Sequence, residues 1–221
     1  MQLKNSYMYY ISAIKPEMCK KIISHGLSKM VVDESKGVSK IASTFDGKEK
    51  GGIDTKGNKV SSTMMSGGAT RETLAKRGID SEKTYVRDSE ISWLNDKWLY
   101  DLFHPYIHHA NRQAGWNWEW DFSESFQFTV YHGRKEKGGF YGWHTDFNAG
   151  TCSVRKLVGI IQLTDPSEYE GGDVQFGIQD KDTKEWYSMN KLKGSITFFP
   201  AFLCHNVVPI SKGKRYVIQE I

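Results

Sequence analysis

The sequence predicts an α+β protein in which helices precede and support an all-β core, either a jelly roll or a barrel. Three observations indicate this fold class. Strict alternation of apolar and polar residues begins near residue 124, short strand-like runs separated by glycine-rich turns follow, and helix-like stretches come before. The length of 221 residues fits one domain, residues 1–221. Within it we expect residues 1–123 to be the helical support and residues 124–221 the β core.

The N-terminal half is expected to supply the helices. Residues 7–14 have the composition of a short strand, and residues 16–30 of a helix, because a proline is tolerated in a first helical turn. Residues 33–70 hold many Gly, Ser, Thr and Lys and few large apolar residues, which predicts a long loop or a mobile lid. Apolar residues recur at helical spacing over residues 91–112, and Pro105 is expected to kink or break this helix.

The residues after 124 are expected to form the strands of the core. Phe126, Phe128 and Val130 occupy one face of the first strand, while Gln127 and Tyr131 lie on the opposite face. The strand-like runs that follow are residues 157–163, 174–178, 195–199 and 215–221.

Composition excludes several classes of protein. The 30 Lys and Arg against 26 Asp and Glu leave a net charge of +4, too little for a dedicated nucleic-acid binder. No apolar run approaches the roughly 18–20 residues that span a bilayer, and the N-terminus lacks the layout of a secretory signal. The three cysteines, Cys19, Cys152 and Cys204, are odd in number and widely spaced, which argues against disulfides or structural zinc. We therefore expect a cytoplasmic protein with no membrane or nucleic-acid partner; the sequence indicates no oligomeric state.

The strongest chemical signal is the tetrapeptide Trp143-His144-Thr145-Asp146. Residues i and i+2 of a strand point to the same face, so His144 and Asp146 can present an imidazole and a carboxylate to one point. His205 is the candidate third ligand. Two histidines and one carboxylate leave open positions on a metal, an arrangement typical of non-haem Fe(II) oxygenases. The alternative is a structural His–Asp pair with an unrelated histidine.

Two further residues strengthen the metal hypothesis. Arg215 lies ten residues after His205 on the last strand-like run, and a guanidinium can bind a carboxylate through two parallel hydrogen bonds. Only one of Lys214 and Arg215 can face inward on a strand. Tyr131 lies thirteen residues before His144, and its phenol could also reach a buried carboxylate. The alternatives are a surface arginine and an ordinary core tyrosine.

Several motifs recur together in a fixed order. They are Tyr131, His144-Thr145-Asp146, Glu170-Gly171-Gly172-Asp173, Lys193-Gly194-Ser195-Ile196-Thr197-Phe198-Phe199-Pro200 and His205-x3-Pro209-x3-Gly213-x-Arg215. Over residues 124–221, and more weakly from Val86-Arg87-Asp88-Ser89 onward, the chain resembles the 2-oxoglutarate- and Fe(II)-dependent dioxygenases of the prolyl 4-hydroxylase type. It is most similar to the small microbial and bacteriophage-encoded members, so the cytoplasm would be that of a host if the chain is phage-encoded.

The resemblance implies a double-stranded β-helix, or jelly roll, with the metal inside one end. It also implies roles for nine residues. His144, Asp146 and His205 would ligate Fe(II), Arg215, Tyr131 and Gln162 would contact 2-oxoglutarate, and Arg155, Gln127 and Trp143 would be candidate substrate-binding residues.

The resemblance further implies hydroxylation of a C–H bond, and we expect the substrate to be prolyl residues in a protein or peptide. O₂ and 2-oxoglutarate would be consumed, succinate and CO₂ released, and ascorbate would serve as reductant. The alternatives are a hydroxylase of a free amino acid or small metabolite, a nucleic-acid demethylase and a non-catalytic β-helix binding module. The demethylase ranks low because residues 206–214 lack the second arginine that those relatives carry.

Overall fold

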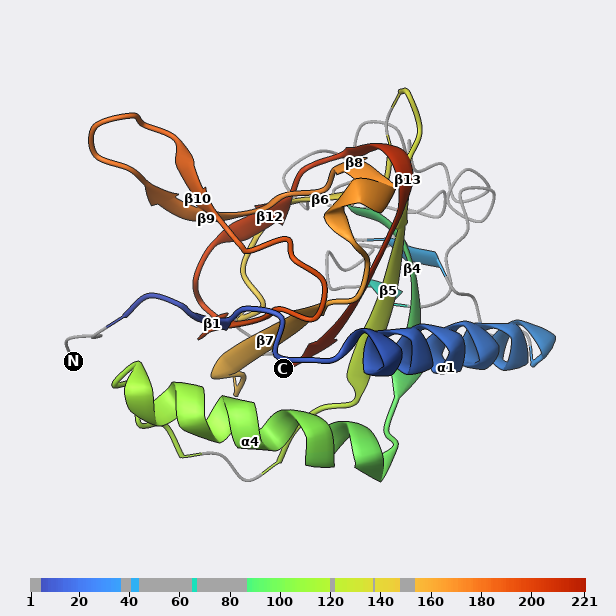
Figure 1. Cartoon of the computed structure of the whole chain (residues 1–221), viewed down its shortest axis with the longest axis horizontal. Coiled ribbons are helices and arrows are strands. Elements are labelled where there is room, and N and C mark those ends of the chain that lie inside the picture. Colours follow the sequence, from blue (N-terminus) through green and yellow to red (C-terminus); the bar gives the residue numbers. More distant parts are fainter. Residues whose placement is uncertain are drawn as a thin grey trace, which may run out of the picture.

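The strands form two facing antiparallel layers, and two helices cover the outer side of one of them (Figure 1). The computed structural model describes residues 5–36, 41–43, 65–66, 87–119, 122–136, 138–147 and 154–221. This architecture is the predicted double-stranded β-helix, or jelly roll, with supporting helices.

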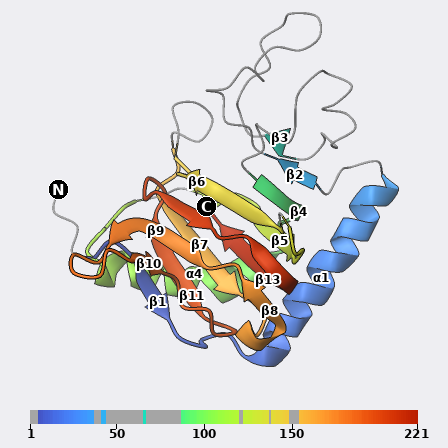
Figure 2. The same ribbon diagram turned by 90° about the horizontal axis from the view of Figure 1, so that it is seen from above.

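The larger layer, called here the major sheet, contains six strands. In spatial order they are β1 (Met8–Tyr10), β11 (Ile196–Pro200), β7 (Leu157–Gln162), β13 (Ile210–Glu220), β5 (Phe126–His132) and β4 (Arg87–Leu94). The short strands β2 (Ile41–Ser43) and β3 (Met65–Ser66) continue this sheet beyond β4 (Figure 2).

The smaller layer, called here the minor sheet, faces the major sheet across the interior. Its strands are β10 (Trp186–Ser188), β9 (Val174–Gln179), β12 (His205–Val207) and β6 (Phe140–His144). The first two residues of β4 pair with β6, which joins the two layers along one side. A short 3-10 turn, η1 (Pro166–Glu168), leads into β8 (Tyr169–Gly171), which pairs with the start of β13.

The two helices differ in part from the sequence prediction. Helix α1 (Pro16–Ser35) begins at the expected proline and runs five residues beyond Met30. Helix α4 (Lys97–Gln113) begins later than predicted, because residues 91–94 belong to β4. The prediction of a helix from residue 91 is therefore wrong. Five register pairs with β5 stabilise residues 90–94 as a strand, and such long-range pairing overrides a local apolar spacing.

Pro105 lies inside α4 without ending it. Its side chain and that of Asp101, one turn earlier, are on the exposed face of the helix. The carbonyl that loses its hydrogen bond to proline can therefore be hydrated, which lowers the cost of proline at this position. The predicted break at Pro105 does not occur.

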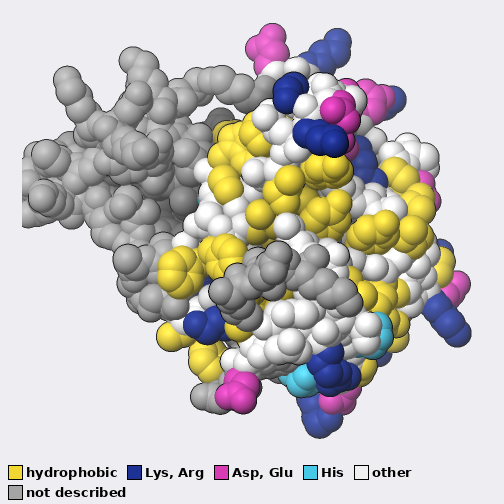
Figure 3. All heavy atoms as spheres, turned by 90° about the vertical axis from the view of Figure 1, so that its left-hand side faces the viewer, with side chains coloured by type: hydrophobic (Ala, Val, Ile, Leu, Met, Phe, Trp, Pro, Cys, Tyr) yellow, Lys and Arg dark blue, Asp and Glu magenta, His cyan; other side chains and the backbone are white. Residues whose placement is uncertain are grey.

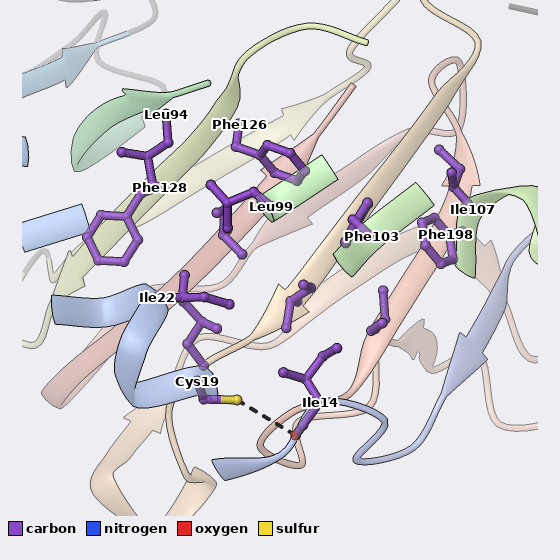
Figure 4. Close-up of a cluster of buried hydrophobic side chains, with 14 of the residues drawn as sticks. Ile14, Cys19, Ile22, Leu94, Leu99, Phe103, Ile107, Phe126, Phe128 and Phe198 are labelled. Carbon is purple, nitrogen blue, oxygen red and sulfur yellow. Dashed lines mark hydrogen bonds between the residues drawn. The ribbon is translucent and has the colours of Figure 1, made fainter. Parts of the chain in front are cut away.

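The helices pack on the outer face of the major sheet through an apolar layer (Figure 4). Phe103 of α4 lies against Phe126 and Phe198, with ring centroids 5.4 and 5.1 Å apart. Glycines permit this close packing. A Cβ on Gly159 of β7 would lie 2.5 Å from ring atoms of Phe103 and Phe198, and one on Gly26 of α1 would lie 2.4 Å from the ring of Phe128.

Parts of the sequence prediction lie outside the described residues. Most of the expected lid, residues 33–70, falls there; residues 33–35 continue α1, and residues 41–43 and 65–66 form β2 and β3. The division into residues 1–123 and 124–221 stays a prediction, although β1 and β4 show that the first part also contributes strands to the major sheet. Within the described part of the chain, no helix has the length and hydropathy required to cross a membrane.

Candidate metal centre

The three predicted metal ligands lie together inside the β-helix. His144 ends β6 and His205 begins β12, and the two residues are partners in the antiparallel ladder of the minor sheet. Their ring centroids are 4.1 Å apart, and His205 Nε2 is 3.6 Å from Asp146 Oδ2. One donor atom from each of the three residues lies within 4.8 Å of the others. Two imidazoles and a carboxylate form the donor set that suits non-haem Fe(II).

Backbone carbonyls hold both imidazoles in the same way. His144 Nδ1 donates to the carbonyl of Gly142 at 2.7 Å, and His205 Nδ1 donates to that of Leu203 at 2.9 Å. Because a carbonyl oxygen can only accept, the Nδ1 atom carries the proton and Nε2 keeps a lone pair for a metal. Burial, and next the neighbouring His205, hold the pKa of His144 well below its usual value. The neutral ring that a metal requires is therefore favoured.

Asp146 reaches this point by a different route from the one predicted. Strand β6 ends at His144, so Asp146 does not share a strand face with it. Instead Asp146 lies in a bend, and its amide donates to the carbonyl of Ala201 at 2.9 Å. Ala201 belongs to the turn that leads into β12 and His205. The segments that carry Asp146 and His205 are thus hydrogen-bonded to one another.

A cavity extends from the two histidines toward Arg215 on β13. Its lining also includes Tyr131 and Tyr141, and it is narrow, with a volume of about 10 Å³. Arg215 is 1% exposed, whereas the adjacent Lys214 faces solvent, as predicted for neighbours on a strand. The guanidinium lies over the ring of Tyr131, 5.5 Å from its centroid.

The guanidinium of Arg215 is incompletely hydrogen-bonded. Its Nε donates to Gln162 Oε1 at 3.1 Å, while Nη1 and Nη2 are buried and make no hydrogen bond of ordinary distance and angle to a described residue, with the Tyr169 hydroxyl nearby. The buried Tyr169 hydroxyl likewise lacks a hydrogen-bond partner among the described residues. Burial raises the pKa of Tyr169, and the charge of Arg215 opposes that rise.

Buried donors without partners are costly and rare in folded proteins. Two free N–H groups of a guanidinium match the two oxygens of a carboxylate. The groups at the two ends of this cavity therefore match the chemistry of a dicarboxylate such as 2-oxoglutarate, with Arg215 at one end and His144, Asp146 and His205 at the other.

The three candidate substrate-binding residues have different surroundings. Gln127 is buried and accepts a hydrogen bond from Arg87 at 2.6 Å. Arg155 is buried and ion-paired with Glu124. Trp143 precedes His144 on β6 and therefore lies on the opposite side of the strand, 44% exposed. None of the three lines the cavity between the metal centre and Arg215. Their roles stay predictions.

Sequence reasoning missed three residues of the site. Tyr141 stacks on His144 with ring centroids 3.4 Å apart, and the buried guanidinium of Arg87 lies 4.7 Å from the Tyr141 centroid. Tyr169 provides the hydroxyl near Arg215. Arg87 belongs to the weakly matching tetrapeptide at residues 86–89, which was the available signal; no sequence pattern distinguished Tyr141 or Tyr169 from core tyrosines.

Trp143 is part of an exposed aromatic surface. Its ring centroid is 4.9 Å from that of Trp186 on β10, which is 40% exposed. Tyr187 on β10 and Tyr9 on β1 are also exposed. Apolar side chains gather on the side of the molecule that carries β1 and the β9–β10 hairpin (Figure 3).

The remaining histidines do not form a second centre. In the described ranges, His144, Asp146 and His205 are the only group of three residues placed to hold a metal ion. His104 lies 2.9 Å from the buried carboxylate of Glu220.

The comparisons with known proteins agree with the geometry. Residues 126–220 match the model of the 2OG-Fe(II) oxygenase superfamily. A PKHD-type hydroxylase of Synechococcus sp. (strain CC9902) is 37% identical over 84 residues, which are 38% of this chain and 36% of that protein. The aligned stretch therefore spans little more than a third of this curated relative.

Two solved structures show the same fold. A prolyl-4-hydroxylase of Pseudomonas putida has a TM-score of 0.58 at 12% identity, covering 97% of this chain and 90% of that one. A prolyl hydroxylase of Trichoplax adhaerens, in complex with a hypoxia inducible factor peptide fragment, has a TM-score of 0.59 at 13% identity, covering 98% and 82%.

A double-stranded β-helix with two histidines and an aspartate at one end defines a class of protein, the non-haem iron oxygenases. The superfamily match and the cavity lined by Arg215 narrow that class to oxygenases that use 2-oxoglutarate. Residues 126–220 match the 2OG-Fe(II) oxygenase superfamily, a stretch of the chain is similar to a PKHD-type hydroxylase, and the fold is that of prolyl hydroxylases.

Proposed function

We propose that this protein is a 2-oxoglutarate- and Fe(II)-dependent dioxygenase that hydroxylates prolyl residues of a protein or peptide. One observation carries the proposal: the His144–Asp146–His205 donor set and the unpartnered guanidinium nitrogens of Arg215 line or border the same cavity. Such an arrangement can hold a metal and a dicarboxylate side by side. Succinate and CO₂ would be the co-products.

Each side chain has a definable task. Fe(II) would supply the activation of O₂, which no protein side chain can perform. Arg215 would bind the distal carboxylate of 2-oxoglutarate through Nη1 and Nη2, while Gln162 fixes the guanidinium through Nε. Tyr131 would pack against the same group. The carbonyls behind the two histidines would keep Nε2 of each ring directed at the metal.

The lining of the cavity is largely apolar between its two ends. Apolar residues from four strands line the cavity between its two ends: Ile160, Val174, Val207 and Val217. A dry environment strengthens the attraction between Arg215 and a carboxylate. It would also protect reactive species from side reactions with solvent.

A peptide is the substrate we favour. The Trichoplax relative is described as bound to a peptide fragment. Trp143 of the exposed Trp143–Trp186 pair lies on the strand that carries His144, and aromatic surfaces favour extended, proline-rich chains. Substrate contacts by Arg155, Gln127 and Trp143, a lid in residues 33–70, ascorbate as reductant and a cytoplasmic location, in a phage host or otherwise, belong to the same proposal.

The test is a product analysis. The purified protein would be incubated with Fe(II), 2-oxoglutarate, ascorbate and proline-rich peptides, and products followed as +16 Da peptides together with succinate. His144→Ala should abolish both signals, because it removes a metal ligand. His108→Ala, on the exposed side of α4, is the matched control and should keep full turnover.

The outcomes separate the alternatives. Succinate formed with free proline or another small molecule, and not with peptides, would move the substrate to a metabolite. Turnover that survives His144→Ala would contradict the ligand assignment. No Fe(II) binding and no turnover with any substrate would leave a non-catalytic module.

A further inference from the structure

Asp146 is the one member of the metal centre that no strand ladder holds. Two hydrogen bonds fix the peptide units on either side of its Cα instead. Its amide donates to Ala201 O at 2.9 Å, and its carbonyl accepts from Arg155 Nη1 at 3.3 Å. The amide of Phe147 donates to the same Ala201 oxygen at 3.0 Å. The position of the Asp146 carboxylate therefore depends on a side chain nine residues further along the chain.

Arg155 is in turn held by Glu124. Arg155 Nε lies 2.6 Å from Glu124 Oε1, and Nη2 lies 2.7 Å from Oε2, which is a two-point pair between planar groups. The side chain of Arg155 is 5% exposed. All three guanidinium nitrogens thus already contact the protein, so Arg155 has little left to offer a substrate.

Glu124 is itself well anchored at the entrance to β5. Its amide donates to the carbonyl of Ile221 at 3.1 Å, and its carbonyl accepts from the Tyr100 hydroxyl at 3.1 Å. Tyr100 belongs to α4 and Ile221 follows β13. The Glu124 carboxylate is therefore tied to the helical support and to the last strand, both outside the metal centre.

We propose that Arg155 and Glu124 are positioning residues that place Asp146 at the metal. The ion pair fixes the guanidinium, and its third nitrogen fixes the Asp146 peptide from the side opposite Ala201. The proposal rests on the proposed Fe(II) site and gives Arg155 a role other than substrate binding. Residues that orient metal ligands without touching the metal typically change metal affinity when replaced.

The experiment compares conservative variants of the pair in the full chain. Arg155→Lys keeps the charge but cannot bridge Glu124 and the Asp146 carbonyl together, and Glu124→Gln keeps the shape but loses the charge. Fe(II) affinity would be measured anaerobically by calorimetry, well below the melting temperature of each variant. We expect each to weaken Fe(II) binding about 10- to 100-fold.

A second readout needs no metal. In the metal-free protein, exchange of the Asp146 and Phe147 amide hydrogens should become faster in both variants, because their hydrogen bonds to Ala201 open more often. Gly159→Ala is the control for general destabilisation. Its added Cβ crowds Phe103 and Phe198 in the outer layer, so it should lower the melting temperature and leave Fe(II) affinity unchanged.

The outcomes are distinguishable from those of the proposed function. Fe(II) affinity within twofold of wild type in both variants, or an equal loss in Gly159→Ala, would overturn the positioning role. A raised KM for peptide with unchanged Fe(II) affinity in Arg155→Lys would also overturn it, in favour of substrate binding. If the wild type binds Fe(II), the variants lose it, and no peptide is hydroxylated, the positioning role stands and the proposed substrate fails. A wild type that binds no Fe(II) overturns both.

Discussion

The two faces of the major sheet are built from the same strands and have opposite character. On β5, Phe126, Phe128 and Val130 point toward the helices and are fully packed. The alternate residues Gln127 and Tyr131 point into the β-helix, where the strand carries polar groups.

Polar and charged side chains are buried on the inner face, whereas the outer face carries few of them. Arg87, Gln162, Thr197 and Arg215 are all buried on the inner side, and Arg215 and Thr197 have side-chain atoms that lack hydrogen-bond partners among the described residues. On the outer side, a layer of aromatic and aliphatic side chains holds α1 and α4 in place. The outer face is therefore an almost continuous apolar layer, whereas the inner face combines a second apolar cluster with buried polar groups, some of which lack partners.

The largest effect is expected from truncating the outer layer. Phe103→Ala removes a ring packed on Phe126 and Phe198 and should lower the free energy of unfolding by about 3–5 kcal/mol. Denaturant unfolding measures the loss. Fe(II) affinity at low temperature should be unchanged, and a parallel loss of affinity would show that the two faces are not independent.

A smaller effect, of opposite sign, is expected on the inner face. Arg215→Met removes buried donors without partners and should stabilise the metal-free protein by about 1–3 kcal/mol. The same variant should lose the rise in melting temperature that 2-oxoglutarate produces in the wild type. Lys214→Met, one residue earlier and exposed, is the control. A destabilised Arg215→Met protein would mean that the guanidinium is satisfied without ligand.

The smallest effect concerns Glu220, a buried carboxylate on the outer face. Burial raises the pKa of Glu220 above its ordinary value of 4.5. A raised pKa means that the folded state binds the proton more tightly, so this contribution to stability is present below pH 4.5 and is lost as the pH rises through the raised value. Glu220→Gln should therefore match the wild type near pH 4 and be more stable at pH 7. Urea unfolding at both pH values tests this, and a pH-independent difference would contradict it.

Much of the fold follows from local pattern. The strands after residue 124 and the start of α1 were predictable, because period-two alternation and an N-terminal proline are local signals. Residues 91–94 were not, because their apolar spacing also fits a helix and only the pairing with β5 decides between the two. The continuity of α4 through Pro105 likewise depends on which face of the helix meets solvent.

The sequence indicated which residues form the candidate site, but not the contacts that hold them in place. His144, Asp146, His205, Arg215 and Gln162 were named from the sequence, and the structure brings the three donors together and pairs Gln162 with Arg215. The bend that carries Asp146, the Arg155–Glu124 pair and the Tyr141 stack were not visible. They depend on contacts between residues far apart in the chain, which spacing does not encode.

The ladder pairing of His144 with His205 has a consequence for folding. Two of the three metal donors come from neighbouring strands of the minor sheet, so the centre exists only when β6 and β12 are paired. A metal bound there would link the two strands. By mass action it would stabilise the folded state by about 2.7 kcal/mol at a free metal concentration 100 times the dissociation constant. Iron supply would then govern how long the folded chain persists as well as whether it reacts.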